Sequence, residues 1–506
     1  MHIRLAAILL GLSLAAGCAA PSPVDPTPSS QGGQASPPAL VPLGPEICRL
    51  LSTPSPRLRE SATQEMLTLQ ALYAAPNCHP LWSSGAGLTQ SGQELLDRAR
   101  KIGVPDPTAD PASLAERDIL LSAAFAALAV DPADPALRPS AARLTALAGD
   151  AAGSPRSLGL MVPVDPQIRR LRDAIDSYRH IERSGGWPSV PDGPKLALGA
   201  QGARVAALRE RLQASGDVQA TAGDPARFDA MLDAGLRQFQ ARHGLQVDGV
   251  AARETLAALN VPVAARMALL AANLRRAYGQ QRDWGRRYIA VNIAAAAMTL
   301  VEDGHPVVER RAIVGRPAWP TPQLGSVIDR LEFHPAWTVP TRIAQLELLP
   351  KIRKDKTYLK RNHMRIVDGQ IRQAPGPDNP LGQVKFIFAN PYSVYLHDTN
   401  APGLFDRPQR FLSHGCIRVE EAVDLARRLL QDDPAWPPAR IDAALADGTT
   451  QRVDLSRPIP VHLVYDTAWV DERGVINFRA DAYALDPVTT ALRTAAGPPT
   501  DGNCGS

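Results

Sequence analysis

The chain has 506 residues, which is enough for about two to four domains with separate hydrophobic cores. Hydrophobic residues make up 45% of it, so the chain can fold as ordinary globular protein, and its 47 prolines indicate many turns and linkers rather than long helical bundles. The net charge is only +4, from 55 basic and 51 acidic side chains without a long basic run. This balance argues against a nucleic-acid-binding protein.

The first residues predict export. Residues 5–16 form an apolar run that is too short to span a bilayer but suits the central region of a signal peptide. Small residues directly precede Cys18, and this arrangement resembles a bacterial lipobox. We therefore expect residues 1–18 to be a lipoprotein-type signal and Cys18 to be lipidated, with a plain cleaved signal peptide as the alternative. The expected location is periplasmic, with membrane attachment only through the N-terminal lipid.

Export also bears on the five cysteines, because an oxidising compartment permits disulfides. Cys48 and Cys78 lie within one N-terminal region, and we predict a possible disulfide between them, although sequence alone does not fix the pairing. Cys504 lies in a tail rich in glycine and proline. If Cys18 carries lipid, Cys416 remains as a free thiol in a compartment where free thiols are unusual.

The first half of the chain is predicted to be a linker followed by helices. Residues 19–45 are rich in Pro, Ser, Gly and Gln, which is typical of a disordered linker. Residues 46–190 carry apolar side chains three and four positions apart, for example in 113–128, and we predict a helical scaffold domain. This region contains no group of residues with the chemistry of a catalytic site.

Residues 191–262 are predicted to form three short helices around one core. Within them, Leu236–Gln240, His243–Leu245 and Val247–Gly249 resemble the corresponding segments of the three-helix peptidoglycan-binding module. A helical spacer that has lost ligand binding is the alternative. Residues 263–286 are predicted to be a connecting helix.

From residue 287 the hydrophobic period changes to that of β-strands, and we assign 287–455 to a mainly-β domain. Strands are predicted at 288–293, 298–301, 307–314, 328–333, 337–339, 384–388 and 394–396, and a helix at 420–430. Residues 341–383 interrupt the pattern and are basic, so we expect a capping insertion beside a site, with a solvated charged surface as the alternative. Residues 456–485 are predicted to add C-terminal strands, and 486–506 a disordered tail.

The predicted fold class is therefore an α+β multidomain protein. It consists of a helical N-terminal scaffold, a three-helix module and a mainly-β domain with a capping insertion.

One group of residues in the β domain has the chemistry of a nucleophilic site. Cys416 follows Gly415, and His397 lies 19 positions earlier at the end of a predicted strand. A neighbouring imidazole raises the population of the reactive thiolate, and two strand ends can bring these side chains together. Gly415 leaves room for a substrate carbonyl, and the backbone N–H groups of Gly415 and Cys416 are candidates for an oxyanion site. The alternative is a structural cysteine beside a turn.

The arrangement of His397 and the tetrapeptide Ser413-His414-Gly415-Cys416 resembles the signature of L,D-transpeptidases with a YkuD-type catalytic domain. Three further stretches, Leu349–Arg353, Val394–Thr399 and Pro460–Tyr465, resemble the large multidomain YcbB-like subgroup. That subgroup also carries a helical scaffold and a peptidoglycan-binding module, in the same order.

The resemblance implies a cysteine acyltransferase acting on peptidoglycan stem peptides. Cys416 is implied to attack the third residue of a tetrapeptide donor, to release D-Ala and to form a thioester. The side-chain amine of a diamino acid in a second stem then accepts the acyl group, which gives a 3→3 cross-link. His397 is implied to be the general base, oriented by a main-chain carbonyl near Asp398. Neither a cofactor nor a metal is implied.

The resemblance also assigns substrate-binding roles and leaves alternatives. Ser413, His414 and Gly415 are placed on the oxyanion and acyl-binding side, and Arg418 is implied to pair with a stem-peptide carboxylate. An L,D-carboxypeptidase, an enzyme that uses another acceptor and a non-catalytic peptidoglycan-binding wall anchor are the alternatives. A papain-like protease is disfavoured, because its nucleophile opens a helix after a different local signature.

Overall fold

The computed structural model describes residues 42–61, 66–74, 77–101, 113–131, 138–219, 223–280 and 283–486. The chain divides into Met1–Pro42 and Leu43–Ser506. The predicted signal peptide, Cys18 and residues 487–506 of the predicted tail, with Cys504, lie outside the described residues, whereas Asp486, where the tail was predicted to begin, is buried and ordered.

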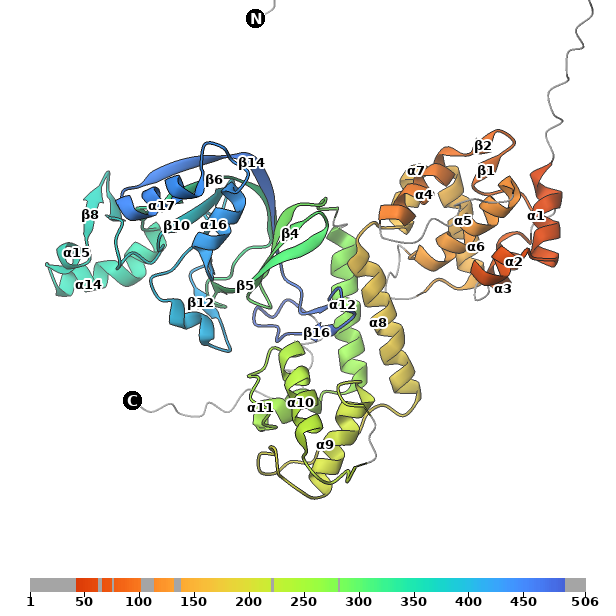
Figure 1. The fold of residues 1–506 in the computed structure, drawn as a ribbon, viewed down its shortest axis with the longest axis horizontal. Helices are drawn as coiled ribbons and strands as arrows, with labels where there is room; N and C mark the ends of the chain where they lie inside the picture. Colours follow the sequence, from red (N-terminus) through yellow and green to blue (C-terminus); the bar gives the residue numbers. More distant parts are fainter. Residues whose placement is uncertain are drawn as a thin grey trace, which may run out of the picture. The chain divides into compact units, whose positions relative to one another are not determined.

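A helical unit with its own core follows Pro42 (Figure 1). Its elements are α1 (Leu43–Ser52), α2 (Pro56–Ser61), α3 (Met66–Leu72), β1 (Ser83–Ser84), β2 (Gly87–Leu88), α4 (Gln90–Lys101), α5 (Leu114–Leu128), α6 (Ala141–Gly153) and α7 (Pro155–Met161). Helix α1 begins inside the predicted linker 19–45. Trp82 and Phe125 pack in the core with ring centroids 5.2 Å apart, and a disulfide joins Cys48 to Cys78 with 5.6 Å between their Cα atoms.

The last predicted scaffold helix belongs to a different core. Helix α8 (Pro166–Arg183) packs along α12 (Val263–Gln280), and both contact the hairpin of β15 (Ala468–Val470) and β16 (Ile476–Phe478). Apolar side chains three and four positions apart on α8, including Ile168, Leu171 and Ile175, form the α8 side of this core. Elements almost 300 residues apart in the sequence thus share one core.

The three-helix module is confirmed. Helices α9 (Ala203–Ala214), α10 (Ala230–Arg242) and α11 (Arg253–Leu259) enclose a core that includes Phe228 and Phe239. The Gln240 carboxamide accepts hydrogen bonds from the backbone N–H groups of Asp248 and Gly249, which fixes the turn before α11. Among the described helices none is individually long and apolar enough to cross a membrane, whereas α11 and α12, bent by 81° at their junction, meet that test as a pair.

The mainly-β domain is confirmed as a nine-stranded sheet. Its strands are β3 (Tyr288–Asn292), β4 (Ala297–Glu302), β5 (His305–Gly315), β6 (Leu324–Phe333), β10 (Val384–Phe388), β11 (Leu396–His397), β12 (Phe411–Ser413), β13 (Ile417–Val419) and β14 (Gln451–Val464). The strand order is β12-β5-β13-β11-β10-β6-β14-β3-β4, and β4 also pairs with β5, so the sheet curls back on itself. Strand β14 crosses the predicted domain boundary at 455/456, so its second half belongs to this sheet and not to a separate C-terminal segment.

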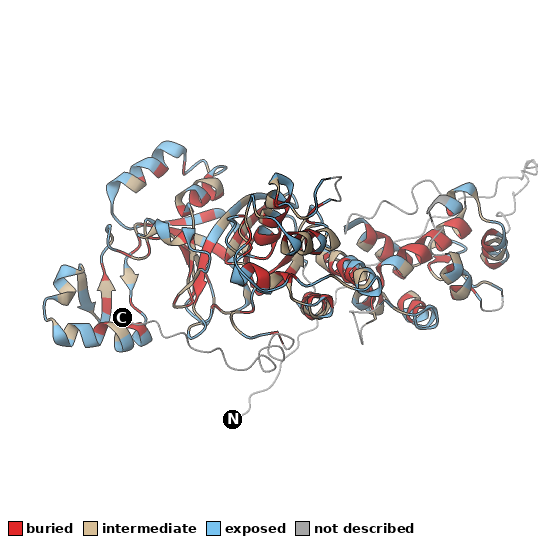
Figure 2. Ribbon diagram, turned by 90° about the horizontal axis from the view of Figure 1, so that it is seen from below, coloured by how far each residue is buried: buried red, intermediate tan, exposed pale blue. Residues whose placement is uncertain are grey.

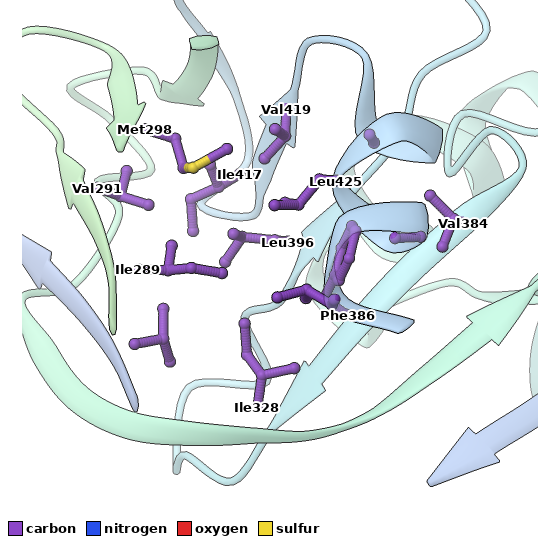
Figure 3. Close-up of a cluster of buried hydrophobic side chains, with 14 of the residues drawn as sticks. Ile289, Val291, Met298, Ile328, Val384, Phe386, Leu396, Ile417, Val419 and Leu425 are labelled. Carbon is purple, nitrogen blue, oxygen red and sulfur yellow. The ribbon is translucent and has the colours of Figure 1, made fainter. Parts of the chain in front are cut away.

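Alternating apolar residues give the sheet a buried inner face (Figure 3). Strand β3 contributes Ile289 and Val291, and β10 contributes Val384 and Phe386, because side chains alternate between the two faces of a strand. Helices α16 (Ala422–Leu430) and α17 (Pro438–Asp447) cover this core. Leu425 of α16 lies against the same cluster.

The insertion folds around a small core of its own. It contains α13 (Thr341–Ile343), the π-helix η1 (Ala344–Leu348), α14 (Leu349–Lys354), α15 (Tyr358–Arg361), β8 (Met364–Val367) and β9 (Gln370–Gln373). Strand β9 pairs with β7 (Trp337–Thr338), and Trp319 packs against the insertion core. Most residues of the insertion are exposed to solvent (Figure 2).

Candidate active site

Parallel pairing of β11 and β13 places the predicted histidine and cysteine on one face of the sheet. Leu396 lies opposite Ile417 and both are fully buried in the core, whereas His397 lies opposite Arg418. Since alternate residues share a face, His397, Arg418 and Cys416 lie on the side away from the core. The structure therefore brings the two sequence-predicted catalytic residues onto neighbouring strand ends.

Charged residues of the neighbouring strands lie on the same face of the sheet as His397. Lys385 of β10 pairs in register with His397 on one side and with Glu332 of β6 on the other, and Glu332 pairs with Arg452 of β14. The Lys385 ammonium lies 3.9 Å from the Glu332 carboxylate, which also accepts a hydrogen bond of 3.0 Å from Arg452. Sequence reasoning missed Lys385, although the alternation of apolar residues from Val384 to Phe388 places it on the face opposite the core.

The Cys416 thiol is the free thiol of the described chain and is only partly exposed. Its Sγ lies 3.9 Å from the carbonyl oxygen of Ser393. Burial raises the pKa of the Cys416 thiol, while Tyr395, the Lys385 ammonium and the Arg418 guanidinium act to lower it. Because burial dominates, the thiol is protonated at neutral pH in the absence of substrate.

His397 is fixed by the backbone next to it. Its Nδ1 donates a 2.6 Å hydrogen bond to the carbonyl oxygen of Asp398, so the proton is on Nδ1 and Nε2 is the acceptor. Burial, with added repulsion from Arg418 and Lys385, lowers the pKa of His397 to about 3. Within the described chain no hydrogen bond joins His397 to the Cys416 sulfur. The imidazole of His397 is thus neutral at neutral pH, with no proton on Nε2.

The turn before Cys416 corrects the predicted oxyanion site. The Ser413 hydroxyl donates to the carbonyl oxygen of Cys416 at 2.6 Å and accepts from the backbone N–H of Gly415 at 3.1 Å. Ser413 is buried and stabilises the turn, and the Gly415 N–H that we expected to face substrate is already occupied. Gly415 has φ of +114°, a conformation that residues with a side chain rarely adopt. No hydrogen bond from the Cys416 N–H is found within the described chain.

Hydrogen bonds from the loop that contains Thr321 and from the C-terminal segment that contains Tyr483 stabilise this turn. The Thr321 hydroxyl donates to the Gly415 carbonyl at 2.8 Å and accepts from the backbone N–H of Gly315 at 2.9 Å. The Tyr483 hydroxyl donates to the Gly315 carbonyl at 2.6 Å and accepts from the Thr321 N–H at 3.2 Å. Neither Thr321 nor Tyr483 was predicted, because no local pattern marks a contact over such sequence distances.

His414 faces the insertion, although it is nearer to Cys416 in sequence than His397 is. Its Nε2 lies 2.6 Å from Oε1 of Glu347 and 2.9 Å from Nη2 of Arg316, and its ring meets Trp319 edge-on at 4.9 Å between centroids. Burial acts to raise the pKa of Glu347, but the hydrogen bonds from His414 and Arg316 hold it below its usual value. The His414 side chain is therefore engaged by Glu347 of the insertion and by Arg316 and Trp319 of the loop before β6.

Arg418 is a cation two residues after Cys416, and it has no acidic partner among the described residues. Burial lowers its pKa, and its Nε is buried without a hydrogen bond. A half-buried guanidinium without a partner is suited to a carboxylate ligand.

A free cysteine and a histidine thus lie on neighbouring strands of a closed, mainly-β domain. Residues 286–444 match the model of the YkuD family, described as L,D-transpeptidase catalytic domain. Residues 201–259 match the model described as "Putative peptidoglycan binding domain". The β domain of this chain is therefore similar to the L,D-transpeptidase catalytic domains of the YkuD family.

A curated relative, the "Putative L,D-transpeptidase" of Haemophilus influenzae, is 33% identical over 219 residues. The match covers 39% of this chain and 44% of the relative, so the chain spans less than half the length of the relative it matches.

Solved L,D-transpeptidases are also similar to this chain. The enzyme from Xylanimonas cellulosilytica is 15% identical, with a TM-score of 0.20, and the match covers 54% of this chain and 98% of that one. The enzyme from Stackebrandtia nassauensis is 13% identical, with a TM-score of 0.22, and the match covers 55% of this chain and 97% of that one.

Proposed function

We propose that this protein is a peptidoglycan L,D-transpeptidase that forms 3→3 cross-links through a thioester on Cys416. The observation that carries the proposal is the placement of Cys416 and His397 on one face of two neighbouring parallel strands, within a YkuD-type domain. A domain of this type implies an acyltransferase, and the second matched domain implies peptidoglycan as the substrate.

In the first half-reaction, Sγ of Cys416 attacks the carbonyl carbon of the third stem residue and its proton passes to Nε2 of His397. The Cys416 N–H stabilises the oxyanion of the tetrahedral intermediate. The C–N bond to D-Ala then breaks, and His397 returns the proton to the departing amine. The product is a thioester between Cys416 and the donor stem.

In the second half-reaction, a side-chain amine of another stem attacks the thioester. His397 takes a proton from the amine, the C–S bond breaks, and the proton restores the Cys416 thiol. One amide bond replaces another, so the reaction consumes no nucleotide.

We propose that substrate binding raises the basicity of His397. His397 is a poor base at rest because burial and the charges of Arg418 and Lys385 depress its pKa. A stem-peptide carboxylate bound to Arg418 would offset part of this positive field and raise the basicity of His397. Proton transfer would then follow binding rather than precede it.

We also propose that the protein is exported to the periplasm and anchored by lipid on Cys18. The Cys48–Cys78 disulfide supports this location, because such bonds persist in oxidising compartments.

An L,D-carboxypeptidase is a second candidate, since water could replace the acceptor amine at the thioester. The test is incubation of the detergent-solubilised full chain with purified disaccharide-tetrapeptide, followed by mass spectrometry of the products. D-Ala release with dimer formation, abolished in Cys416→Ala, supports the transpeptidase. Tripeptide monomer alone would identify a carboxypeptidase. No D-Ala release by the wild type would exclude both enzymes and favour a non-catalytic wall anchor.

A further inference from the structure

The π-helix of the insertion directs an acidic side chain at the catalytic motif. Segment η1 replaces regular α-helix between α13 and α14, and such irregular turns are frequent at functional sites. Glu347 lies within η1, and its Oε1 accepts from Nη2 of Arg316 at 3.0 Å and contacts Nε2 of His414 at 2.6 Å. The insertion thus contributes a carboxylate to a motif that lies 67 residues further along the chain.

The chemistry of the three groups decides where the His414 proton lies. An ionised carboxylate only accepts and a guanidinium only donates. The 2.6 Å contact with Glu347 therefore requires a proton on Nε2 of His414, and Arg316 donates to Glu347 and not to that nitrogen. Glu347 in this way selects the Nε2–H form of His414.

Aromatic packing ties the same cluster to the loop that supports the catalytic turn. Trp319 meets His414 edge-on, and the Arg342 guanidinium of the insertion lies 3.9 Å from the centroid of its ring. Two residues later in this loop, Thr321 holds the Gly415 carbonyl. The insertion, the loop and the motif are therefore joined through one set of contacts.

We propose that Glu347 is a positioning residue that acts through His414. It fixes the orientation and protonation of this side chain, so the turn that presents Cys416 is set only when the insertion is docked. The proposal rests on the proposed function for its kinetic readout, whereas its proton readout is independent of activity.

The test uses the isotope-labelled full chain and long-range ¹H–¹⁵N spectra of the histidine side chains, with the His414 signals assigned through His414→Gln. The wild type is expected to show the Nε2–H form of His414. Glu347→Ala is expected to lose it, as is Glu347→Asp, which keeps the charge but is too short to reach. Glu347→Gln is expected to retain it, because the amide oxygen still accepts.

Turnover of disaccharide-tetrapeptide provides the second readout. Glu347→Ala and Glu347→Asp are expected to lower kcat by about tenfold with little change in KM, as loss of a charged hydrogen bond predicts, and Glu347→Gln to recover most of the rate. Asp368→Asn is the matched control, because it removes an exposed carboxylate of the same insertion away from the motif.

An unchanged His414 spectrum in Glu347→Ala would overturn the proposal, and so would equal kcat values for Glu347→Ala and Asp368→Asn. If Glu347→Ala does not fold, Glu347→Asp decides by the same two criteria. If the wild type has no transpeptidase activity, the proposed function fails, and the spectrum alone tests the role of Glu347.

Discussion

Cys416 and His397 are both held in their uncharged forms, and nearby charges shift the pKa of each side chain. The Lys385 ammonium lies 4.1 Å from the centroid of the Tyr395 ring and acts to lower the pKa of the Cys416 thiol. An ammonium next to a thiol favours the thiolate, so removing it should make the nucleophile harder to ionise.

Lys385→Met is therefore expected to raise the pKa of Cys416 and to slow its alkylation by iodoacetamide several-fold near neutral pH. The pH dependence of the alkylation rate measures this directly. Lys356→Met, on the exposed surface of the insertion, is the control and should leave the profile unchanged. A lower or unchanged Cys416 pKa in Lys385→Met would contradict the claim that the Lys385 ammonium lowers the pKa of this thiol.

His397 also makes stability depend on pH. Its pKa is about 3 in the folded domain, below the ordinary value of 6.5, so the unfolded state binds more protons between these values. The stabilising contribution is complete above pH 6.5 and is lost as the pH falls towards 3, by up to about 1.4 kcal/mol per pH unit.

We expect the free energy of opening of β11, measured by hydrogen exchange, to fall between pH 6.5 and 4.5, and His397→Gln to flatten this slope. His305→Gln, at an exposed position, serves as the control and should keep the wild-type slope. A wild-type slope that is already flat would show that His397 is not held neutral by burial.

At the scale of elements, alternation of apolar residues predicted the strands that build the buried face of the sheet. Strands β3, β4, β5, β6 and β10 lie close to their predicted positions. The missed elements include the short strands β8, β9, β12 and β15. Neither their length nor their composition distinguishes them from loops, and tertiary contacts stabilise them instead.

Individual hydrogen bonds of the turn before Cys416 were also beyond prediction from the sequence. The motif predicted that strand ends would carry Cys416 and His397, and the two residues lie on neighbouring strands. It could not show that the Gly415 N–H donates to Ser413 or that Thr321 donates to the Gly415 carbonyl. Such details depend on backbone direction, which residue types alone do not specify.

Thr321→Val is expected to reduce kcat by about tenfold and the free energy of unfolding of the catalytic domain by about 1–3 kcal/mol, because two buried backbone groups lose their partner. Steady-state D-Ala release and thermal unfolding measure the two effects. Thr299→Val, at a strand position outside the site, provides the comparison. Wild-type kcat in Thr321→Val would show that the turn holds itself in place.

At the scale of the whole molecule, the C-terminal segment connects units that the sequence analysis treated separately. Asp486 forms a 2.5 Å ion pair with Arg276 of α12, Arg479 donates to the Arg242 carbonyl of the three-helix module at 3.0 Å, and Tyr483 reaches the catalytic loop. These contacts join residues about 170 to 240 positions apart, a range over which hydrophobic periodicity carries no information.

The N-terminal helical unit, by contrast, has its own core and its own covalent link. Removing the disulfide in Cys48→Ser/Cys78→Ser is expected to destabilise this unit by about 3 kcal/mol, since the bond closes a loop across 30 residues. Limited proteolysis should show faster cleavage before Met161, while the kcat of D-Ala release stays at the wild-type value. If kcat falls in proportion to the rise in the cleavage rate, the N-terminal helical unit and the catalytic domain do not unfold independently.

The nucleophilic role of Cys416 is tested most directly by mass spectrometry of the full chain, trapped and digested shortly after mixing with disaccharide-tetrapeptide. We predict a thioester adduct of the disaccharide-tripeptide on the peptide that contains Cys416, formed with release of D-Ala and much more slowly in His397→Gln. An adduct on another residue, or D-Ala release that persists in Cys416→Ala, would contradict the account.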